Sequence, residues 1–250
     1  MTNIKFQRAD SAAFANKVSK KIAGWYSKPE YHERAVERIV LQREEIYALL
    51  EKVEKVSVNK LLKYLDDSGF FYRPSAAIRH HNFPGGLAEH SLGVFRIVEE
   101  WNNMSPQERK NSELYHFNLS RKQVNCDIFS EKMDYDDMVI ATICHDLCKA
   151  KHYYFDGRTI KTHHSDPEPQ RAHATLSVKR LVENDIDSPN CAEIRLAVLM
   201  HMHLFSIPRF PKEAHYQILG KKSMLTIAVW AADKLDASRH PANKQRHRDL

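Results

Sequence analysis

The sequence predicts an all-α protein, built as a helical bundle with one small β-hairpin. Only 7 glycines occur in its 250 residues, whereas about 7% glycine is usual in globular proteins. Apolar side chains recur at intervals of three and four residues over most of the chain, which places them along one face of a helix. With 42% hydrophobic and 28% charged residues, the composition favours a helix-rich globular protein.

Residues 1–77 are predicted to form an accessory region of helices. The first helix is expected over residues 11–27, with Ser11 as its cap. A longer helix follows Pro29, and Ser57 caps a short third helix. Their apolar residues have helical spacing, but no cluster of chemically reactive side chains occurs in this part of the sequence.

The second region, residues 78–240, is predicted to hold most of the remaining helices. These are expected from Gly86 to about Trp101, from Asp136 to about Lys149, and near residues 170–185, 191–205, 212–219 and 222–239. Residues 103–134 are polar and irregular, with short strands expected around Leu114–Leu119. The run HYYFDGRTIK has two extended segments joined by Asp156-Gly157, which is a strong hairpin signal. A basic tail, residues 241–250, ends the chain.

Charge and composition indicate the class of partner. The net charge of +6 and a pI near 9.0 suit anionic partners such as nucleotides or nucleic acid, although a solvated basic surface is the alternative. No apolar stretch approaches the roughly 20 residues of a membrane span, and the N-terminus lacks the apolar core of a secretory signal. The four cysteines form no close CxxC pair. We therefore expect a cytoplasmic protein with reduced thiols and no membrane partner.

The strongest chemical signal is the pair His145-Asp146 in the string MVIATICHDLCKA. Imidazole and carboxylate together suit a divalent transition metal, but one such pair is weak evidence in a chain with 15 histidines. Four further ligand-type residues each fall on the apolar face of a predicted helix: His90, His173, His201 and Asp233. A single inward histidine is more often part of the core. Several inward histidines on separate helices, together with buried carboxylates that need a counter-charge, favour a metal site.

The order His, His-Asp, His, His, Asp resembles the HD-domain superfamily of metal-dependent phosphohydrolases. The segment HHNFPGGLAEHSLGV is similar to the first-ligand segment of HD domains in bacterial 3′–5′ exoribonucleases and phage-type HD hydrolases. CHDLCKA resembles the superfamily's His-Asp signature. AHATLSV, LMHMHLF and AVWAADKLDA resemble the segments of the last three ligands. The resemblance covers roughly residues 78–240 and implies an HD-domain helical bundle.

The resemblance also implies a ligand set for one or two divalent ions, drawn from Mn, Fe, Mg, Ni, Co and Zn. The first ion would be held by His90, His145, Asp146 and Asp233, and the second by Asp146, His173 and His201. His203 competes with His201 because MHMH presents both, and we prefer His201 because it continues the apolar stripe of Ile194 and Ala197. Ala172 and Ala174, which flank the third histidine, depart from the residues common in the superfamily.

The expected activity is hydrolysis of a phosphoester in a nucleotide or a single-stranded nucleic acid. Two close metal ions can acidify a bridging water and polarise the phosphoryl oxygens, so no serine or cysteine nucleophile is needed. Asp146 and Lys149 are the expected catalytic residues. Lys149 resembles the superfamily's lysine that contacts the substrate phosphate. The alternative is that Lys149 is an ordinary lysine at a helix C-terminus, where the helix dipole favours a cation. Weaker candidates for phosphate contact are Arg79, His80, His81, Lys151, Arg158 and Lys161.

Two other interpretations remain open at this point, and a third does not. Some proteins with this ligand order are di-iron oxygenases, which would predict bound iron and no phosphate-lined pocket. A non-catalytic nucleotide-binding module is the second alternative, although all six ligand positions are filled. The third, a zinc site of Cys144, Cys148 and His152, is set aside because no fourth ligand is evident and both cysteines lie in an apolar context that favours buried thiols.

Overall fold

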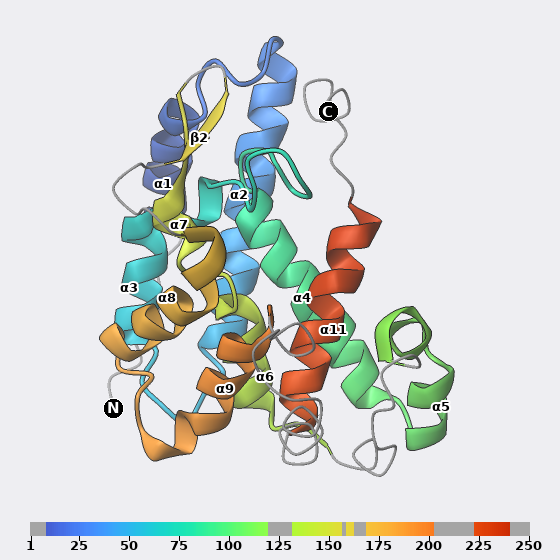
Figure 1. Cartoon of the computed structure of the whole chain (residues 1–250). Coiled ribbons are helices and arrows are strands. Elements are labelled where there is room, and N and C mark those ends of the chain that lie inside the picture. Colours follow the sequence, from blue (N-terminus) through green and yellow to red (C-terminus); the bar gives the residue numbers. More distant parts are fainter. Residues whose placement is uncertain (1–8, 120–131, 157–158, 163–168, 203–222, 241–250) are drawn as a thin grey trace.

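The computed structural model describes residues 9–119, 132–156, 159–162, 169–202 and 223–240. These residues are mostly helical and include one two-stranded antiparallel hairpin, so the prediction of an all-α bundle with a small hairpin is confirmed (Figure 1). The helices are α1 (Ala9–Lys21), α2 (Pro29–Leu50), α3 (Asn59–Ser68), α4 (Gly86–Asn103), α5 (Pro106–Asn111), α6 (Tyr135–Cys144), α7 (Lys149–His152), α8 (Pro169–Glu183), α9 (Ala192–Met200) and α11 (Met224–Arg239). Short helical turns occur at Phe70–Tyr72, Tyr115–Leu119 and Pro189–Cys191.

The centre of the bundle is formed by α4, α6, α9 and α11. Helix α4 packs against both α6 and α11, and α9 packs against α6, α8 and α11 (Figure 1). Every residue of α11 from Met224 to Asp233 is buried, as is every residue of α6 from Asp137 to Cys144. A helix that is apolar on nearly all sides belongs in the interior. The last buried turn of each of these helices therefore lies deep in the protein.

The N-terminal helices share the core of the remaining bundle. Helix α1 packs on α2, and α2 packs on α4 and α6, so Phe14 and Ile39 belong to the same buried apolar cluster as Leu235. The Arg43 guanidinium on α2 donates two hydrogen bonds to the Asp66 carboxylate on α3, at 2.8 and 2.7 Å. The Tyr47 hydroxyl donates to the same carboxylate at 2.7 Å. The boundary expected at residue 77 stays a prediction.

The hairpin is formed by β1 (Tyr153–Phe155) and β2 (Ile160–Thr162), which confirms the two extended runs expected there. Phe155 pairs with Ile160 in an antiparallel register. The ring of Phe155 meets Trp25 edge to face, with ring centroids 4.5 Å apart. This contact joins the hairpin to the segment between α1 and α2, beside which the hairpin lies in Figure 1.

Three helices end earlier than the sequence predicts. Helix α1 stops at Lys21 rather than 27, α6 at Cys144 rather than Lys149, and α9 at Met200 rather than 205. After α6 the chain continues in a tighter turn, in which the amides of Leu147 and Lys149 donate to the carbonyls three residues before them, at 3.1 and 2.9 Å. Such 3₁₀-type bonds are common at helix ends. The helix expected near 212–219 lies outside the described residues.

The strands expected around Leu114–Leu119 are wrong. Residues Tyr115–Leu119 form a wide helical turn, and the His116 amide donates to the Ser112 carbonyl at 3.1 Å. A short apolar run fits either structure by periodicity alone. Here Leu114 is buried in the helical core, and no strand of the described chain pairs with this segment.

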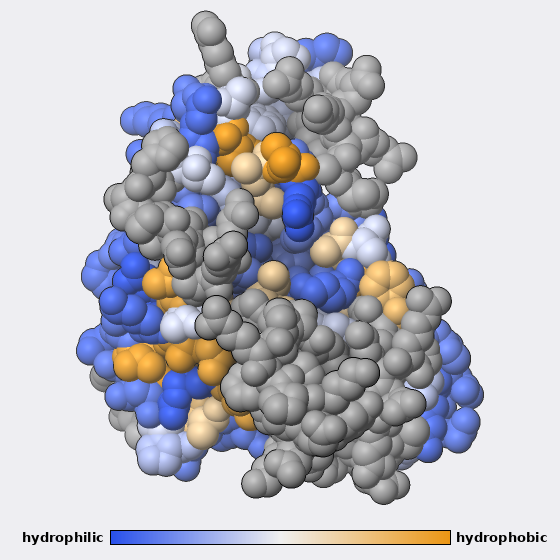
Figure 2. Space-filling model, in the orientation of Figure 1, coloured by the Kyte–Doolittle hydropathy of each residue, from blue (hydrophilic) through white to orange (hydrophobic). Residues whose placement is uncertain are grey.

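No helix within the described ranges is long and apolar enough to cross a membrane. On the face shown in Figure 2, apolar residues of the described surface lie in separate patches among hydrophilic ones.

The pair of Arg43 and Asp66 generates a prediction about stability. Replacing Asp66 by Ala leaves the buried Arg43 guanidinium without its charge partner, and removing one member of a buried pair costs several kcal/mol. Because the Asp66 side chain is 21% exposed, we expect a loss of about 3 kcal/mol in the free energy of unfolding, near the low end for buried pairs. Urea denaturation of the wild type and the variant measures this difference in the free energy of unfolding.

The matched control is the neighbouring residue, Asp67→Ala. Asp67 pairs with Lys63 on the surface, where its side chain is 62% exposed, and exposed pairs contribute little. Equal stability losses in the two variants would contradict the importance of the buried pair.

Candidate metal centre

The six side chains predicted as metal ligands converge between α4, α6, α8, α9 and α11. They are His90 in α4, His145 and Asp146 in the turn after α6, His173 in α8, His201 directly after α9, and Asp233 in α11. All six are buried. They arrive from five separate segments of the chain, so the packing of the bundle, and not local sequence, brings their polar atoms together.

The first group of ligand atoms belongs to His90, His145 and Asp233. The Nε2 atoms of the two imidazoles lie 3.1 Å apart, and Asp233 Oδ1 lies 3.2 Å from His90 Nε2 and 3.9 Å from His145 Nε2. A metal about 2.0–2.2 Å from each donor separates the donors by about 3–3.5 Å. The observed separations fit such an ion with a small adjustment at Asp233.

The second group belongs to Asp146, His173 and His201. Here the two Nε2 atoms lie 3.2 Å apart, and Asp146 Oδ1 lies 3.7 Å from His173 Nε2 and 3.5 Å from His201 Nε2. The other oxygen of the same carboxylate, Oδ2, lies 3.3 Å from His145 Nε2 in the first group. Asp146 therefore presents one oxygen to each group, as a bridging ligand does.

The hydrogen bonds of the rings show which nitrogens carry lone pairs. Nδ1 of His145 donates to the Thr142 carbonyl at 2.8 Å, and Nδ1 of His201 donates to the Val198 carbonyl at 2.6 Å. A carbonyl only accepts, so the proton of a neutral ring is on Nδ1 and the lone pair on Nε2.

The Nε2 of His145 faces His90 Nε2, the Nε2 of His201 faces His173 Nε2, and each also lies near an oxygen of Asp146. The buried Oδ1 of Asp146 accepts no hydrogen bond. A divalent cation bound among these Nε2 atoms and the carboxylate would remove the repulsion between their lone pairs. Imidazole nitrogens together with a carboxylate are a suitable donor set for such a cation.

The charges of the two carboxylates are stabilised within the site. Burial by itself raises the pKa of Asp146, but Lys149 and the surrounding imidazoles outweigh it and hold that pKa well below its ordinary value. Burial likewise raises the pKa of Asp233, and here Lys234 and His90 outweigh it in the same direction. Both groups are therefore carboxylates at neutral pH, the form that binds a metal.

The imidazoles differ in their readiness to lose a proton. Burial lowers the pKa of His173 to about 4 and also lowers that of His201, so both rings are neutral and ready to bind. At His90, burial also lowers the pKa, but hydrogen bonds to Asp233 and Asp236 outweigh it and raise the value to about 9. A metal must displace the proton of His90, as is usual when metals bind to histidine.

One lysine lies on each carboxylate. Lys149 Nζ is 2.6 Å from Asp146 Oδ2, because residues three apart in a 3₁₀-type turn lie one above the other. Lys234 Nζ is 2.7 Å from Asp233 Oδ2. The side chain of Lys149 is 15% exposed and that of Lys234 is 35% exposed. Lys234 was not among the predicted site residues, although the sequence offers it as an ion-pair partner of the adjacent Asp233, and this pair is formed.

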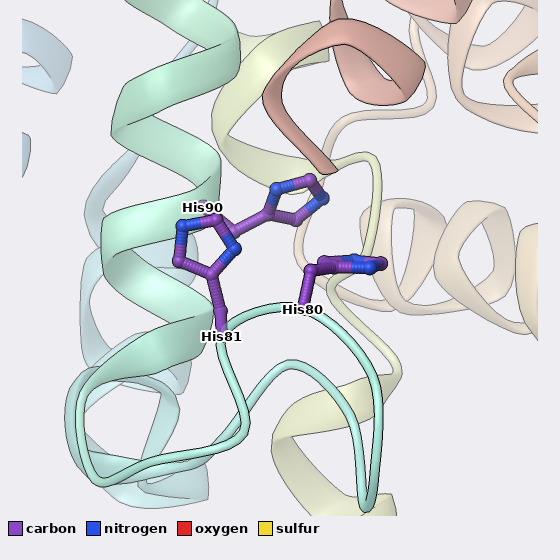
Figure 3. A group of neighbouring side chains, drawn as sticks. All are labelled: His80, His81 and His90. Atoms are coloured by element: carbon purple, nitrogen blue, oxygen red, sulfur yellow. The ribbon is translucent and has the colours of Figure 1, made fainter. Parts of the chain in front are cut away.

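The weaker candidates for phosphate contact separate into two sets. The rings of His80 and His81, from the loop before α4, lie beside His90, with centroids 4.9 and 5.2 Å from its ring (Figure 3). Lys151 instead extends over the ring of Tyr64 on α3, 5.1 Å from its centroid. The structure thus brings two of these candidates to the cluster and directs a third elsewhere.

Of the others, Arg79 is exposed in the loop before His80. Lys161 is exposed on β2, with its Nζ 3.8 Å from Asp156 Oδ2. Arg158 and His203 lie outside the described residues, so the choice of His201 over His203 stays a prediction, while His201 is seen within the cluster.

The cysteines beside the His-Asp pair are buried thiols. Burial raises the pKa of Cys144 and raises that of Cys148 to about 12, so neither is a thiolate at neutral pH. Among the described residues, no group of neighbouring metal-binding side chains includes a cysteine. The expectation of buried thiols at these positions agrees with the structure.

The arrangement of ligands can be compared with known protein families. The family model described as HD domain matches residues 87–238. The chain belongs to the HD-domain family. The matched range includes all six of the clustered residues, and HD domains are generally metal-dependent phosphohydrolases. No curated protein and no solved structure matches the chain. The buried His/Asp clusters are consistent with the metal-dependent chemistry of the family.

Proposed function

We propose that this HD-domain protein is a cytoplasmic phosphohydrolase that requires divalent metal ions and cleaves a phosphoester of a nucleotide or nucleic acid. One observation supports the proposal above the others: two groups of three ligand atoms meet at the two oxygens of Asp146. Two metal ions held about 3.5–4 Å apart are typical of enzymes that hydrolyse phosphoesters. We assign His90, His145 and Asp233 to one ion, His173 and His201 to the other, and Asp146 to both.

The protein side chains divide the work of binding and charge balance. When bound, the ions supply Lewis acidity and a water of lowered pKa. The imidazole Nε2 atoms and the carboxylates would fix the positions of the ions. Backbone carbonyls already hold the rings of His145 and His201, and Lys149 already holds the Asp146 carboxylate. The neighbouring thiols of Cys144 and Cys148 are protonated, and they take no part as nucleophiles.

Lys149 is the residue that we assign to the substrate phosphate. Its ammonium group now neutralises Asp146 at 2.6 Å. With an ion held by Asp146, the Lys149 ammonium would no longer be needed to neutralise that carboxylate and could donate to a phosphoryl oxygen of the substrate. Without an ion, burial lowers the pKa of Lys149, but the Asp146 carboxylate outweighs burial and raises it above the ordinary value, so the ammonium group is present at neutral pH.

The substrate class is inferred from charge. The chain carries a net charge of +6, and the ammonium groups of Lys149 and Lys234 lie at the two carboxylates of the site. Cationic surroundings raise the local concentration of anionic substrates. Mononucleotides, cyclic nucleotides and single-stranded oligonucleotides all present phosphates of this kind.

The proposal is tested by measuring hydrolysis of these three classes with Mn²⁺, Mg²⁺ or Fe²⁺ added to metal-free protein. We expect release of phosphate or nucleotide from at least one class, and a loss of about 10³-fold or more in His145→Ala and Asp146→Ala, the range seen when a residue essential to a catalytic unit is removed. Equal hydrolysis by the wild type and both variants would rule out the assignment. Bound iron, a mixed-valence colour and dioxygen uptake without hydrolysis would indicate an oxygenase instead.

The role of Lys149 generates a separate prediction. Lys149→Ala should keep its metal content but lose about 10²–10³-fold in kcat/KM, as when one donor to a developing charge is removed. Steady-state kinetics and elemental analysis together measure this, and Lys151→Ala is the matched control because its amino group lies over Tyr64. If both lysine variants retained full activity, Lys149 would have no role with the substrate.

A further inference from the structure

A third buried carboxylate lies one helical turn beyond Asp233. Asp236 is on α11, three residues after Asp233, and only 3% of it is exposed. Its Oδ2 atom accepts a hydrogen bond from His90 Nδ1 at 2.6 Å. His90 Nε2, on the opposite side of the ring, lies 3.2 Å from Asp233 Oδ1. The ring of His90 is thus held between two carboxylates of the same helix.

Helix α4 is shaped to receive Asp236. Gly93 lies one turn after His90, on the same face of α4, and a Cβ atom at Gly93 would stand only 2.1 Å from Asp236 Oδ1 and 2.8 Å from its Cγ. Any side chain at this position would therefore displace the carboxylate. Where α4 meets α11, His90 therefore lies against both Asp233 and Asp236, and Gly93 lies against Asp236.

We propose that Asp236 is a positioning residue for the metal ligand His90, and that Gly93 provides the space that it needs. This inference rests on the proposed metal-dependent function. By accepting the Nδ1 proton, the carboxylate fixes the tautomer and rotation of the ring and makes Nε2 a stronger donor. His145 and His201 receive only the partial charge of a backbone carbonyl. The Nδ1 of His90 thus donates to a carboxylate, whereas the Nδ1 atoms of His145 and His201 donate to backbone carbonyl dipoles.

Two more imidazole rings lie near the Asp236 carboxylate. His81 Nε2 lies 3.6 Å from Oδ2, and His240 Nε2 lies 3.9 Å from Oδ1. The rings of His81 and His240 are also in contact, with centroids 4.5 Å apart and planes tilted by 45°. His81 has a left-handed backbone, with φ of 50°, which directs this ring of the loop toward the carboxylate. Two elements besides α4 therefore converge on the group that holds His90.

The test is the affinity for Mn²⁺ of metal-free protein, measured by titration calorimetry in the wild type and in Asp236→Asn. Loss of a partner behind a metal-bound histidine typically weakens binding by about 10–100-fold, and we expect a loss in that range. The matched control is Asp137→Asn, which removes a buried carboxylate of α6 that pairs with Lys55. We expect the control to change the affinity by no more than about two-fold, because it does not touch the ligands.

A measurement on the unmodified protein keeps the inference testable if Asp236→Asn does not fold. In zinc-loaded wild type, ¹⁵N NMR should show His90 with a proton on Nδ1 and the metal on Nε2. Metal on Nδ1, or equal Mn²⁺ affinity in the wild type and a folded Asp236→Asn, would overturn the role of Asp236 but not the proposed function. A wild type that binds neither Mn²⁺ nor Zn²⁺ would instead refute the proposed function itself.

Discussion

The structure depends on keeping two ionised carboxylates, Asp146 and Asp233, inside an apolar helical core. A buried charge without compensation is strongly destabilising, and here four imidazoles and two lysines surround the pair. The lysines reach only one oxygen of each carboxylate, and Asp146 Oδ1 receives no hydrogen bond. Divalent ions would coordinate the oxygen atoms that the lysines do not reach.

This requirement explains several local features of the fold. The tight turn after α6 stacks Lys149 over Asp146, which a continuous α-helix would not do to the same degree. Helices α4 and α11 approach closely at Gly93, so that a carboxylate can enter between them. The aliphatic core around α6, α9 and α11 encloses the buried carboxylates and imidazoles, where electrostatic contacts are stronger than at the surface.

Much of the site could be predicted from sequence because helical periodicity identifies inward positions, and the order of ligand residues resembles a known family. The hairpin was predictable from Asp156-Gly157, because an Asp-Gly pair between two extended runs is a strong turn signal. The early end of α6 was not, because its i→i+3 hydrogen bonds depend on tertiary packing. Spacing places Asp236 beside Asp233 and Gly93 beside His90, but periodicity does not tell which residues meet across two helices. The helical turn after Leu114 was missed because short apolar runs are ambiguous.

The bridging position of Asp146 is tested most directly by electron paramagnetic resonance of protein loaded with two equivalents of Mn²⁺. Two ions that share a carboxylate at about 3.5–4 Å should give an exchange-coupled spectrum in the wild type. The coupling should disappear in Asp146→Asn. A spectrum of isolated Mn²⁺ ions in the fully loaded wild type would contradict the shared site.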